Sequence, residues 1–302
     1  MAYVAFDVDS TVGYFEVVNA LANFWSPDYI NNMEQSVYSG KARISERLAK
    51  KLKKARDLFA AELFRHPKLL YTVLRSNIHA MFGPLLKLKR AGLLRAVVLY
   101  SNTSVGYSLE LAKALIEKLF HSPGLISCMV DHWHPIRTAD HPEPLAPLRY
   151  IEPVKQFDTL EAIFKRATGS RASVRPTSVL FVDDRRKKHA LQAQEREGLT
   201  YVVPTPFFVN TTYEQKRKLF ELALGALADA GVLGDPEYQV SKFCTRDIPY
   251  DYTNVFFVRN FYQLKGFVWR QMTSAAEYKG SWKNDTAKLN REFDYYLGRF
   301  VF

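Results

Sequence analysis

Two carboxylates follow the first apolar run of the chain, and they constrain its fold more than any other feature. Residues 3–6 (Tyr-Val-Ala-Phe) are apolar, and Asp7 and Asp9 come directly after them. A short run of this kind is typical of a buried strand in a parallel sheet, and ligands bind open α/β sheets at the carboxyl ends of such strands. Because residues i and i+2 of an extended segment point the same way, Asp7 and Asp9 can face one ligand.

Further polar side chains occupy matching positions along the chain. They are Ser101 and Asn102 after the apolar run 95–100, Asp183 and Asp184 after the run 178–182, and Lys155 at the start of an amphipathic stretch, 155–164. Each pair that ends an apolar run is expected at the same edge of one sheet, because the carboxyl ends of parallel strands meet there.

Apolar runs and helical periodicity alternate through most of the chain. Strands are predicted near 2–8, 95–101, 126–130, 178–183 and 200–203, and helices near 15–25, 45–63, 67–91 and 107–118. This alternation predicts the α/β class, with a doubly wound parallel sheet and right-handed crossovers.

The combination of Asp-x-Asp-x-Thr at 7–11, Ser101, Lys155 and the pair Asp183 and Asp184 resembles the four motifs of the haloacid dehalogenase (HAD) superfamily of phosphoryl-transfer enzymes. The resemblance covers about residues 1–205 and implies a Rossmann-like HAD core. Its nearest-looking branch is the phosphatases of the RNA polymerase C-terminal repeat and of the nuclear envelope, and proteins of large DNA viruses are also similar. Those phosphatases have little insertion after the first motif, so their phosphoserine specificity is not carried over.

The resemblance implies a Mg²⁺-dependent phosphatase with an aspartyl-phosphate intermediate. Attack by a carboxylate divides one slow displacement into two easier steps, and a hard divalent cation screens the two anions. The implied catalytic residues are Asp7 as nucleophile, Asp9 as general acid and base, Ser101 and Lys155. The implied phosphate ligands are Thr11, Ser101, Asn102 and Lys155, and the implied metal ligands are Asp7, Asp9, Asp183 and Asp184.

Each of these residues also has an ordinary structural interpretation. Asp7 and Asp9 could be turn acids after a strand, and Ser101 could cap the helix that follows it. Lys155 could be a solvated helix lysine.

Composition limits the class of protein. Of 302 residues, 47% are hydrophobic, which indicates a globular chain, and no apolar run reaches the length of a membrane span. The N-terminus lacks the pattern of a signal peptide, and the two cysteines, Cys128 and Cys244, lie far apart. We therefore expect a soluble intracellular protein of the cytoplasm or nucleus, without membrane insertion.

The domain organisation is predicted as a HAD-like core interrupted once and extended once. The core is assigned to residues 1–13 and 93–244, a cap-like helical insertion to 14–92, and an aromatic and basic extension to 245–302. The extension could pack on its own domain, contact a protein partner or stack on nucleic-acid bases.

The formal net charge of +11 predicts an anionic partner. The basic runs at 41–56 and 185–188 are either solvated faces or sites that attract a phosphorylated polymer. The candidate substrates are a phosphoprotein, a nucleic-acid end phosphate and a small phosphoester, and one of the first two is expected. The alternative function is a non-catalytic HAD-fold interaction or assembly protein, including a viral structural component.

Overall fold

The computed structural model describes residues 1–15, 45–103, 106–132, 134–140, 154–185, 191–207, 212–238 and 286–300. The chain divides into two compact units. The first comprises Met1–Phe15, Leu74–Phe207 and Gly280–Phe302, and the second comprises Glu16–Val73 and Phe208–Lys279. The expected helix at 15–25 and most of the aromatic extension, residues 245–285, lie outside the described residues.

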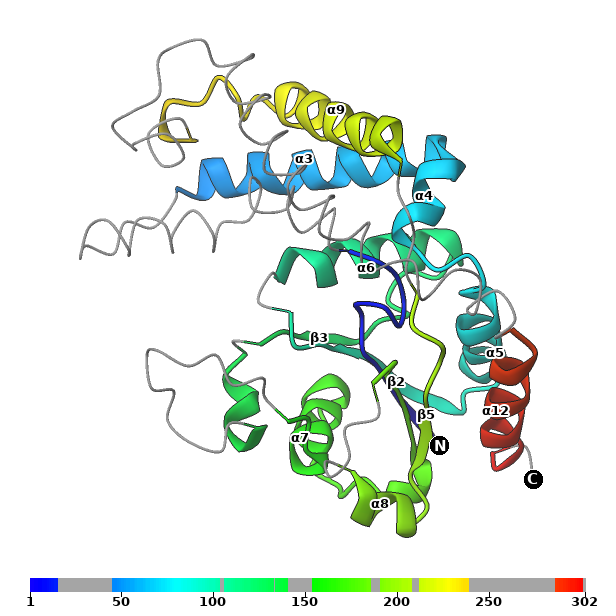
Figure 1. Ribbon diagram of the computed structural model, residues 1–302. Helices are drawn as coiled ribbons and strands as arrows, with labels where there is room; N and C mark the ends of the chain where they lie inside the picture. The colour runs from blue at the N-terminus through cyan, green and yellow to red at the C-terminus, as the bar shows by residue number, and fades with distance from the viewer. Residues whose placement is uncertain are drawn as a thin grey trace. The chain divides into compact units, whose positions relative to one another are not determined.

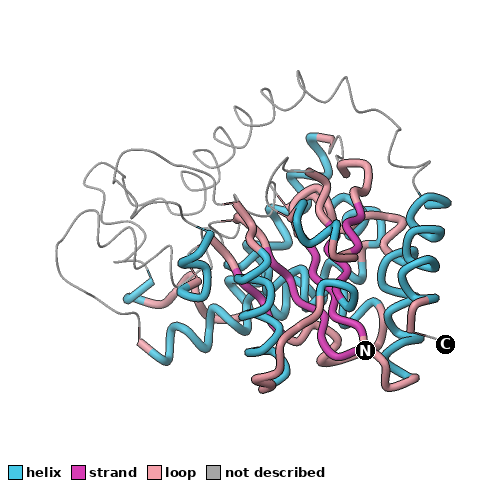
Figure 2. The backbone as a smooth tube through the Cα atoms, turned by 90° about the horizontal axis from the view of Figure 1, so that it is seen from below, coloured by secondary structure: helices cyan, strands magenta, loops and turns pink. Residues whose placement is uncertain are grey.

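The first unit is built on five parallel strands. These are β1 (Ala2–Phe6), β2 (Leu94–Tyr100), β3 (Cys128–Val130), β4 (Val179–Val182) and β5 (Thr200–Val202). They pair in the order β3-β2-β1-β4-β5 and lie side by side (Figures 1 and 2). This topology confirms the doubly wound parallel sheet of the predicted α/β, Rossmann-like class.

The helices of the first unit connect and cover these strands. They are α5 (His79–Arg90), α6 (Gly106–Leu119), η1 (Pro135–Asp140), α7 (Phe157–Thr168), η2 (Pro176–Ser178), α8 (Gln192–Arg196) and α12 (Thr286–Gly298). Within the described residues, no helix has both the length and the apolar character that a membrane crossing requires.

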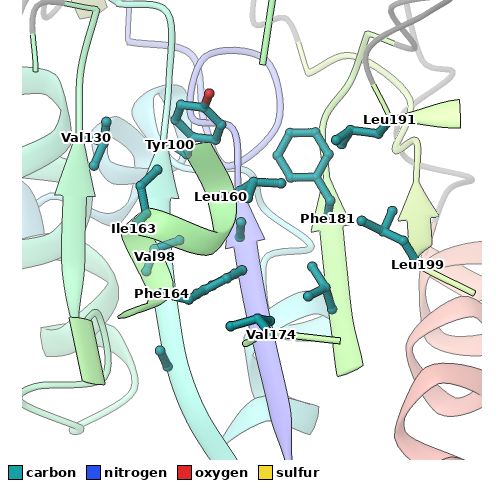
Figure 3. Packing of buried hydrophobic residues seen from close by; sticks show 13 residues of the cluster. Val98, Tyr100, Val130, Leu160, Ile163, Phe164, Val174, Phe181, Leu191 and Leu199 are labelled. Atoms are coloured by element: carbon teal, nitrogen blue, oxygen red, sulfur yellow. The ribbon is translucent and has the colours of Figure 1, made fainter. Parts of the chain in front are cut away.

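Alternate residues of the strands pack on opposite faces of the sheet. On one face, Leu160, Ile163 and Phe164 of α7 lie against Val98 and Phe181 in a buried cluster (Figure 3). On the other face, the ring of Phe6 stacks on Phe82 of α5 at 4.6 Å and lies 6.3 Å from Phe293 of α12. Burial of apolar surface on both faces explains why the strands are almost continuously apolar.

The C-terminal helix α12 belongs to the first unit. Its residues Leu289, Phe293 and Tyr296 are buried, and the helix packs against α5. The Tyr296 hydroxyl lies 3.1 Å from the backbone oxygen of Tyr3 and 2.8 Å from that of Ser178, so it connects β1 with the residue that precedes β4. This part of the predicted extension packs on the sheet domain.

The second unit contains α3 (Glu46–Arg65), α4 (Pro67–Val73) and α9 (Tyr213–Asp229), and α3 packs along α9. Asp235 accepts hydrogen bonds from Arg47 at 3.0 Å and from Lys51 at 2.7 Å. Lys50 pairs with Glu46 and Lys53 with Asp57 on α3 itself. Much of the basic surface predicted along α3 is therefore balanced by acidic partners.

Two helix boundaries differ from the predicted ones. The single helix expected at 67–91 is two helices, because Leu74 forms an antiparallel bridge with Gly13 and the chain turns before α5. The helix expected to open at Lys155 begins at Phe157. The bridge to Gly13 interrupts the helix predicted at 67–91, although the apolar periodicity of the sequence continues across the break.

Candidate active site

The register of the sheet brings the motifs to one edge. Phe6 of β1 pairs with Leu99 of β2 and with Val182 of β4. The backbone pairing continues past each strand: the Asp7 amide donates to Val182 O at 2.8 Å, and the Ser101 amide donates to Val130 O at 3.0 Å. The acidic pair after β4 and the hydroxyl after β2 therefore flank the acids that follow the central strand.

Lys155 reaches this edge from the segment that precedes α7. Its ammonium lies 2.7 Å from Asp7 Oδ1 and 2.8 Å from Asp183 Oδ2, and the residue is only 4% exposed. The rings of Tyr100 and Phe181, labelled in Figure 3, lie with their centroids 5.5 Å from the same nitrogen. Lys155 is therefore a buried cation between two carboxylates, which rules out the solvated helix lysine.

Three carboxylates converge beside this cation. Oxygen atoms of Asp7, Asp183 and Asp184 lie within 4.8 Å of one another. With all three acids ionised, one lysine leaves an excess of negative charge in a buried place. Such a set of carboxylate oxygens suits a hard divalent cation such as Mg²⁺, and a bound cation would balance the excess charge.

The pKa values reflect this crowding. Burial raises the pKa of Asp7 above its ordinary value, opposed by Lys155 and reinforced by Asp183. Burial and the charges of Asp7 and Asp183 raise the pKa of Asp184 to about 7. Burial alone would lower the pKa of Lys155, but Asp183 and Asp7 outweigh it and raise that pKa, so the lysine stays charged.

Thr11 is bound to one of these acids. Its hydroxyl donates to Asp184 Oδ1 at 3.1 Å and accepts from the Asp184 amide at 2.9 Å. The hydroxyl therefore orients an acid of the carboxylate cluster. The role of Thr11 in phosphate binding stays a prediction.

The other predicted residues lie at the same end of the sheet. Ser101 is buried, and its hydroxyl oxygen accepts from the Thr103 amide at 3.3 Å, which leaves its proton for a second bond. Asn102 Oδ1 accepts from Arg137 at 2.6 Å. Asp9 is partly exposed, forms a backbone bridge with Gly13 and is not one of the three converging acids. The metal contact predicted for Asp9 is made by its backbone carbonyl, and this contact stays a prediction.

Two buried arginines near the site were not predicted from the sequence. Arg75 donates to the backbone oxygen atoms of Ser10 and Thr11, and Arg137 donates to that of Ser101 at 2.7 Å. Both side chains are fully buried. Composition and periodicity carry no signal for them, because arginine usually marks a surface position.

Arg185 extends the basic character of the sequence to this edge. Its amide donates to Asp183 Oδ1 at 2.9 Å, and its side chain, 67% exposed, lies 4.0 Å from Asp184 Oδ2. The remaining residues of the predicted basic run, 186–188, lie outside the described residues.

No protein-family model and no curated protein sequence matches this chain. Among solved structures, the crystal structure of CbbY from Rhodobacter sphaeroides in complex with phosphate is similar to it. The alignment has 16% sequence identity and a TM-score of 0.32, and it covers 68% of this chain and 87% of that chain. Likeness at this level supports no inference about function, so the functional assignment depends on the site itself.

Proposed function

We propose that this chain is a Mg²⁺-dependent phosphatase of the HAD type, with Asp7 as its nucleophile. The observation that carries the proposal is Lys155, buried between Asp7 and Asp183 with Asp184 alongside. The carboxylates after the parallel strands supply a nucleophile for attack on phosphorus, and the lysine between them supplies a cation for the phosphoryl group.

In the proposed first step, a carboxylate oxygen of Asp7 attacks phosphorus and the bond from phosphorus to the leaving oxygen breaks. Asp9 donates a proton to that oxygen as it leaves. The Lys155 ammonium holds Asp7 Oδ1 and offsets negative charge on the phosphoryl group. Ser101 donates its hydroxyl proton to a phosphoryl oxygen, and Asn102 lies beside it.

In the second step, Asp9 takes a proton from water as the water oxygen attacks phosphorus. The bond to Asp7 breaks, and the products are inorganic phosphate and free enzyme. Asp7, Asp183, Asp184 and the backbone carbonyl of Asp9 are the groups that would hold Mg²⁺. When bound, the ion screens the repulsion between the phosphate and Asp7.

The substrate that we propose is a phosphoprotein or a nucleic-acid end phosphate. The net charge of +11 supports an anionic macromolecule, and the exposed Arg185 beside Asp184 offers a cation near the reacting group. The aromatic extension at 245–302 is our candidate for binding a protein partner through the residues that precede α12, because α12 itself packs on the sheet domain.

The test is hydrolysis of an aryl phosphate by the full chain, with Mg²⁺ and with a chelator. We expect turnover only with Mg²⁺ and none in Asp7→Asn, whose side chain has nearly the same shape but is a poor nucleophile. Asp158→Asn is the matched control, because Asp158 is an exposed acid on α7. Full activity in Asp7→Asn would exclude the assigned nucleophile. A folded, Mg²⁺-binding wild type without turnover on phosphoproteins, nucleic-acid ends or aryl phosphates would favour the non-catalytic alternative.

A further inference from the structure

The guanidinium of Arg75 is fully buried and binds the loop that follows β1. Its Nε donates to Thr11 O at 2.8 Å, and its Nη2 donates to Ser10 O at 3.1 Å. Nη2 also donates to Thr205 O, and the Arg75 amide donates to Val12 O at 3.0 Å. One side chain therefore connects the loop after β1 with the segment after β5.

This loop has a backbone conformation that needs such support. Ser10 has a φ of +62°, in the left-handed region that residues other than glycine seldom adopt. Its carbonyl oxygen accepts from the Phe207 amide at 2.7 Å as well as from Arg75. Both lone pairs of that oxygen are thereby used, and the turn is held from two sides.

The same loop carries the hydroxyl that orients Asp184. The carbonyl oxygen of Thr11 accepts a hydrogen bond from Arg75 Nε. Its hydroxyl donates one hydrogen bond to the Asp184 carboxylate and accepts another from the Asp184 amide. A continuous series of contacts therefore leads from Arg75 through Thr11 to a carboxylate of the converging group.

We infer that Arg75 is a positioning residue for metal binding, which acts by fixing Thr11 and, through it, the Asp184 carboxylate. The inference depends on the proposed function, because the metal is the ion that the phosphatase would use. Groups that orient metal ligands from outside the coordination sphere commonly change metal affinity by about 10- to 100-fold.

The chemistry of the side chain explains why arginine occupies this place. The planar guanidinium offers several donors in fixed directions, so it can bind the carbonyl groups of Thr11, Ser10 and Thr205 at once. A lysine in the same position has one flexible ammonium, and a methionine has no donor. Arg75→Lys therefore removes the fixed geometry of the donors but keeps the charge, whereas Arg75→Met removes both.

The test measures Mg²⁺ affinity through thermal stability, because a ligand that binds only the folded state raises the unfolding midpoint with its concentration. The thermal unfolding midpoint is measured against Mg²⁺ concentration at pH 8. The proteins compared are the wild type, Arg75→Lys, Arg75→Met, Thr11→Val and the double variant that combines Arg75→Met with Thr11→Val. We expect Arg75→Met to raise the Mg²⁺ Kd by about 10- to 100-fold, and Arg75→Lys to raise it less.

The double variant separates positioning from general weakening of the fold. If Arg75 acts through Thr11, Arg75→Met adds no further loss of Mg²⁺ affinity once Thr11 is valine. Arg137→Lys is the matched control, since Arg137 is equally buried but holds the backbone of Ser101. We expect its Mg²⁺ Kd to equal that of the wild type.

The outcomes separate the inference from the proposed function. A wild type whose midpoint does not respond to Mg²⁺ would overturn the proposed metal site and, with it, the inference. A wild type that binds Mg²⁺ while the Arg75 variants keep its Kd would overturn the inference alone. If Arg75→Met does not fold, an unchanged Kd in Arg75→Lys has the same meaning. Additive losses in the double variant would exclude the route through Thr11.

Discussion

The ammonium of Lys155 lies 2.7 Å from Asp7 Oδ1, although 148 residues separate the two in the sequence. The same nitrogen lies 2.8 Å from Asp183 Oδ2. The buried ammonium of Lys155 therefore joins Asp7, which follows the central strand β1, to Asp183, which follows the neighbouring strand β4.

Replacement of Lys155 by methionine should destabilise the protein. Without the cation, three converging carboxylates remain in a buried place, and loss of one partner of a buried ion pair commonly costs about 3–5 kcal/mol. The loss of stability should be smaller at pH 5 than at pH 8, because protonation of the carboxylates at pH 5 relieves the repulsion among them. Urea unfolding at both pH values measures the difference.

The control for this change is Lys165→Met. Lys165 lies on α7 and pairs with Glu161 at 3.1 Å near the surface, so its loss should change the free energy of unfolding by about 0.5 kcal/mol or less. Equal effects of the two substitutions would contradict the structural role assigned to Lys155.

The raised pKa of Asp184 predicts a stability that depends on pH and Mg²⁺. The pKa is about 7 in the folded chain against 3.8 ordinarily, so between these values the folded state holds a proton that the unfolded state has released. The contribution of this group to the free energy of unfolding therefore falls as pH rises from about 4 to above 7. Bound Mg²⁺ should restore stability at pH 8, because it binds the ionised carboxylate.

The measurement is the free energy of unfolding against pH, with and without Mg²⁺, for the wild type and Asp184→Asn. The amide cannot ionise but can still accept from Thr11, so the variant should lose part of the pH dependence and most of the response to Mg²⁺. The exposed control Asp158→Asn should keep both. A pH profile in Asp184→Asn identical to that of the wild type would contradict the assignment of the titration to this acid.

The proposed acid role of Asp9 predicts a dependence on the leaving group. General acid catalysis contributes about 10²- to 10⁴-fold where the departing oxygen is basic. Asp9→Asn should therefore slow attack on an alkyl phosphate more than attack on an activated aryl phosphate. Single-turnover rates are the required measurement, since they separate the first step from breakdown of the intermediate. Equal single-turnover losses for the two substrates would count against the acid role.

The hydroxyl of Tyr296 predicts that the C-terminal helix stabilises the sheet. Tyr296→Phe leaves the carbonyl groups of Tyr3 and Ser178 without this donor, which should cost about 1–3 kcal/mol. The adjacent Tyr295 is 68% exposed, so Tyr295→Phe is a matched control with little expected effect. Chemical unfolding measures the free energy of unfolding of both variants. If Tyr296→Phe has the same free energy of unfolding as the wild type, the contact of the hydroxyl contributes nothing to stability.

The strands could be predicted closely because apolar runs followed by acids or hydroxyls have few alternative structures. The predicted strand at 178–183 corresponds to Val179–Val182, and the one at 95–101 corresponds to Leu94–Tyr100. The convergence of Asp7 with Asp183 and Asp184 also follows from parallel topology alone, since these residues come just after neighbouring strands.

The support around the site could not be predicted, because it depends on contacts between distant segments. Arg75 lies in a break between two helices, and the break itself exists because Leu74 pairs with Gly13. The sequence pattern around Arg75 continues with helical period through that break. Similarly, the hydroxyl of Thr11 could have faced a phosphate, and only the folded geometry directs it to Asp184.

The central position of β1 affects how the protein is made. It leaves the ribosome before both of its neighbours in the sheet, which begin only at Leu94 and Val179. At a synthesis rate of about 5–20 residues per second, the backbone edges of Ala2–Phe6 stay open for about 4–18 s until β2 begins and for about 9–35 s until β4 begins. Such edges are templates for pairing with other chains. The open edges of β1 therefore expose the nascent chain to aggregation until both neighbouring strands have been made.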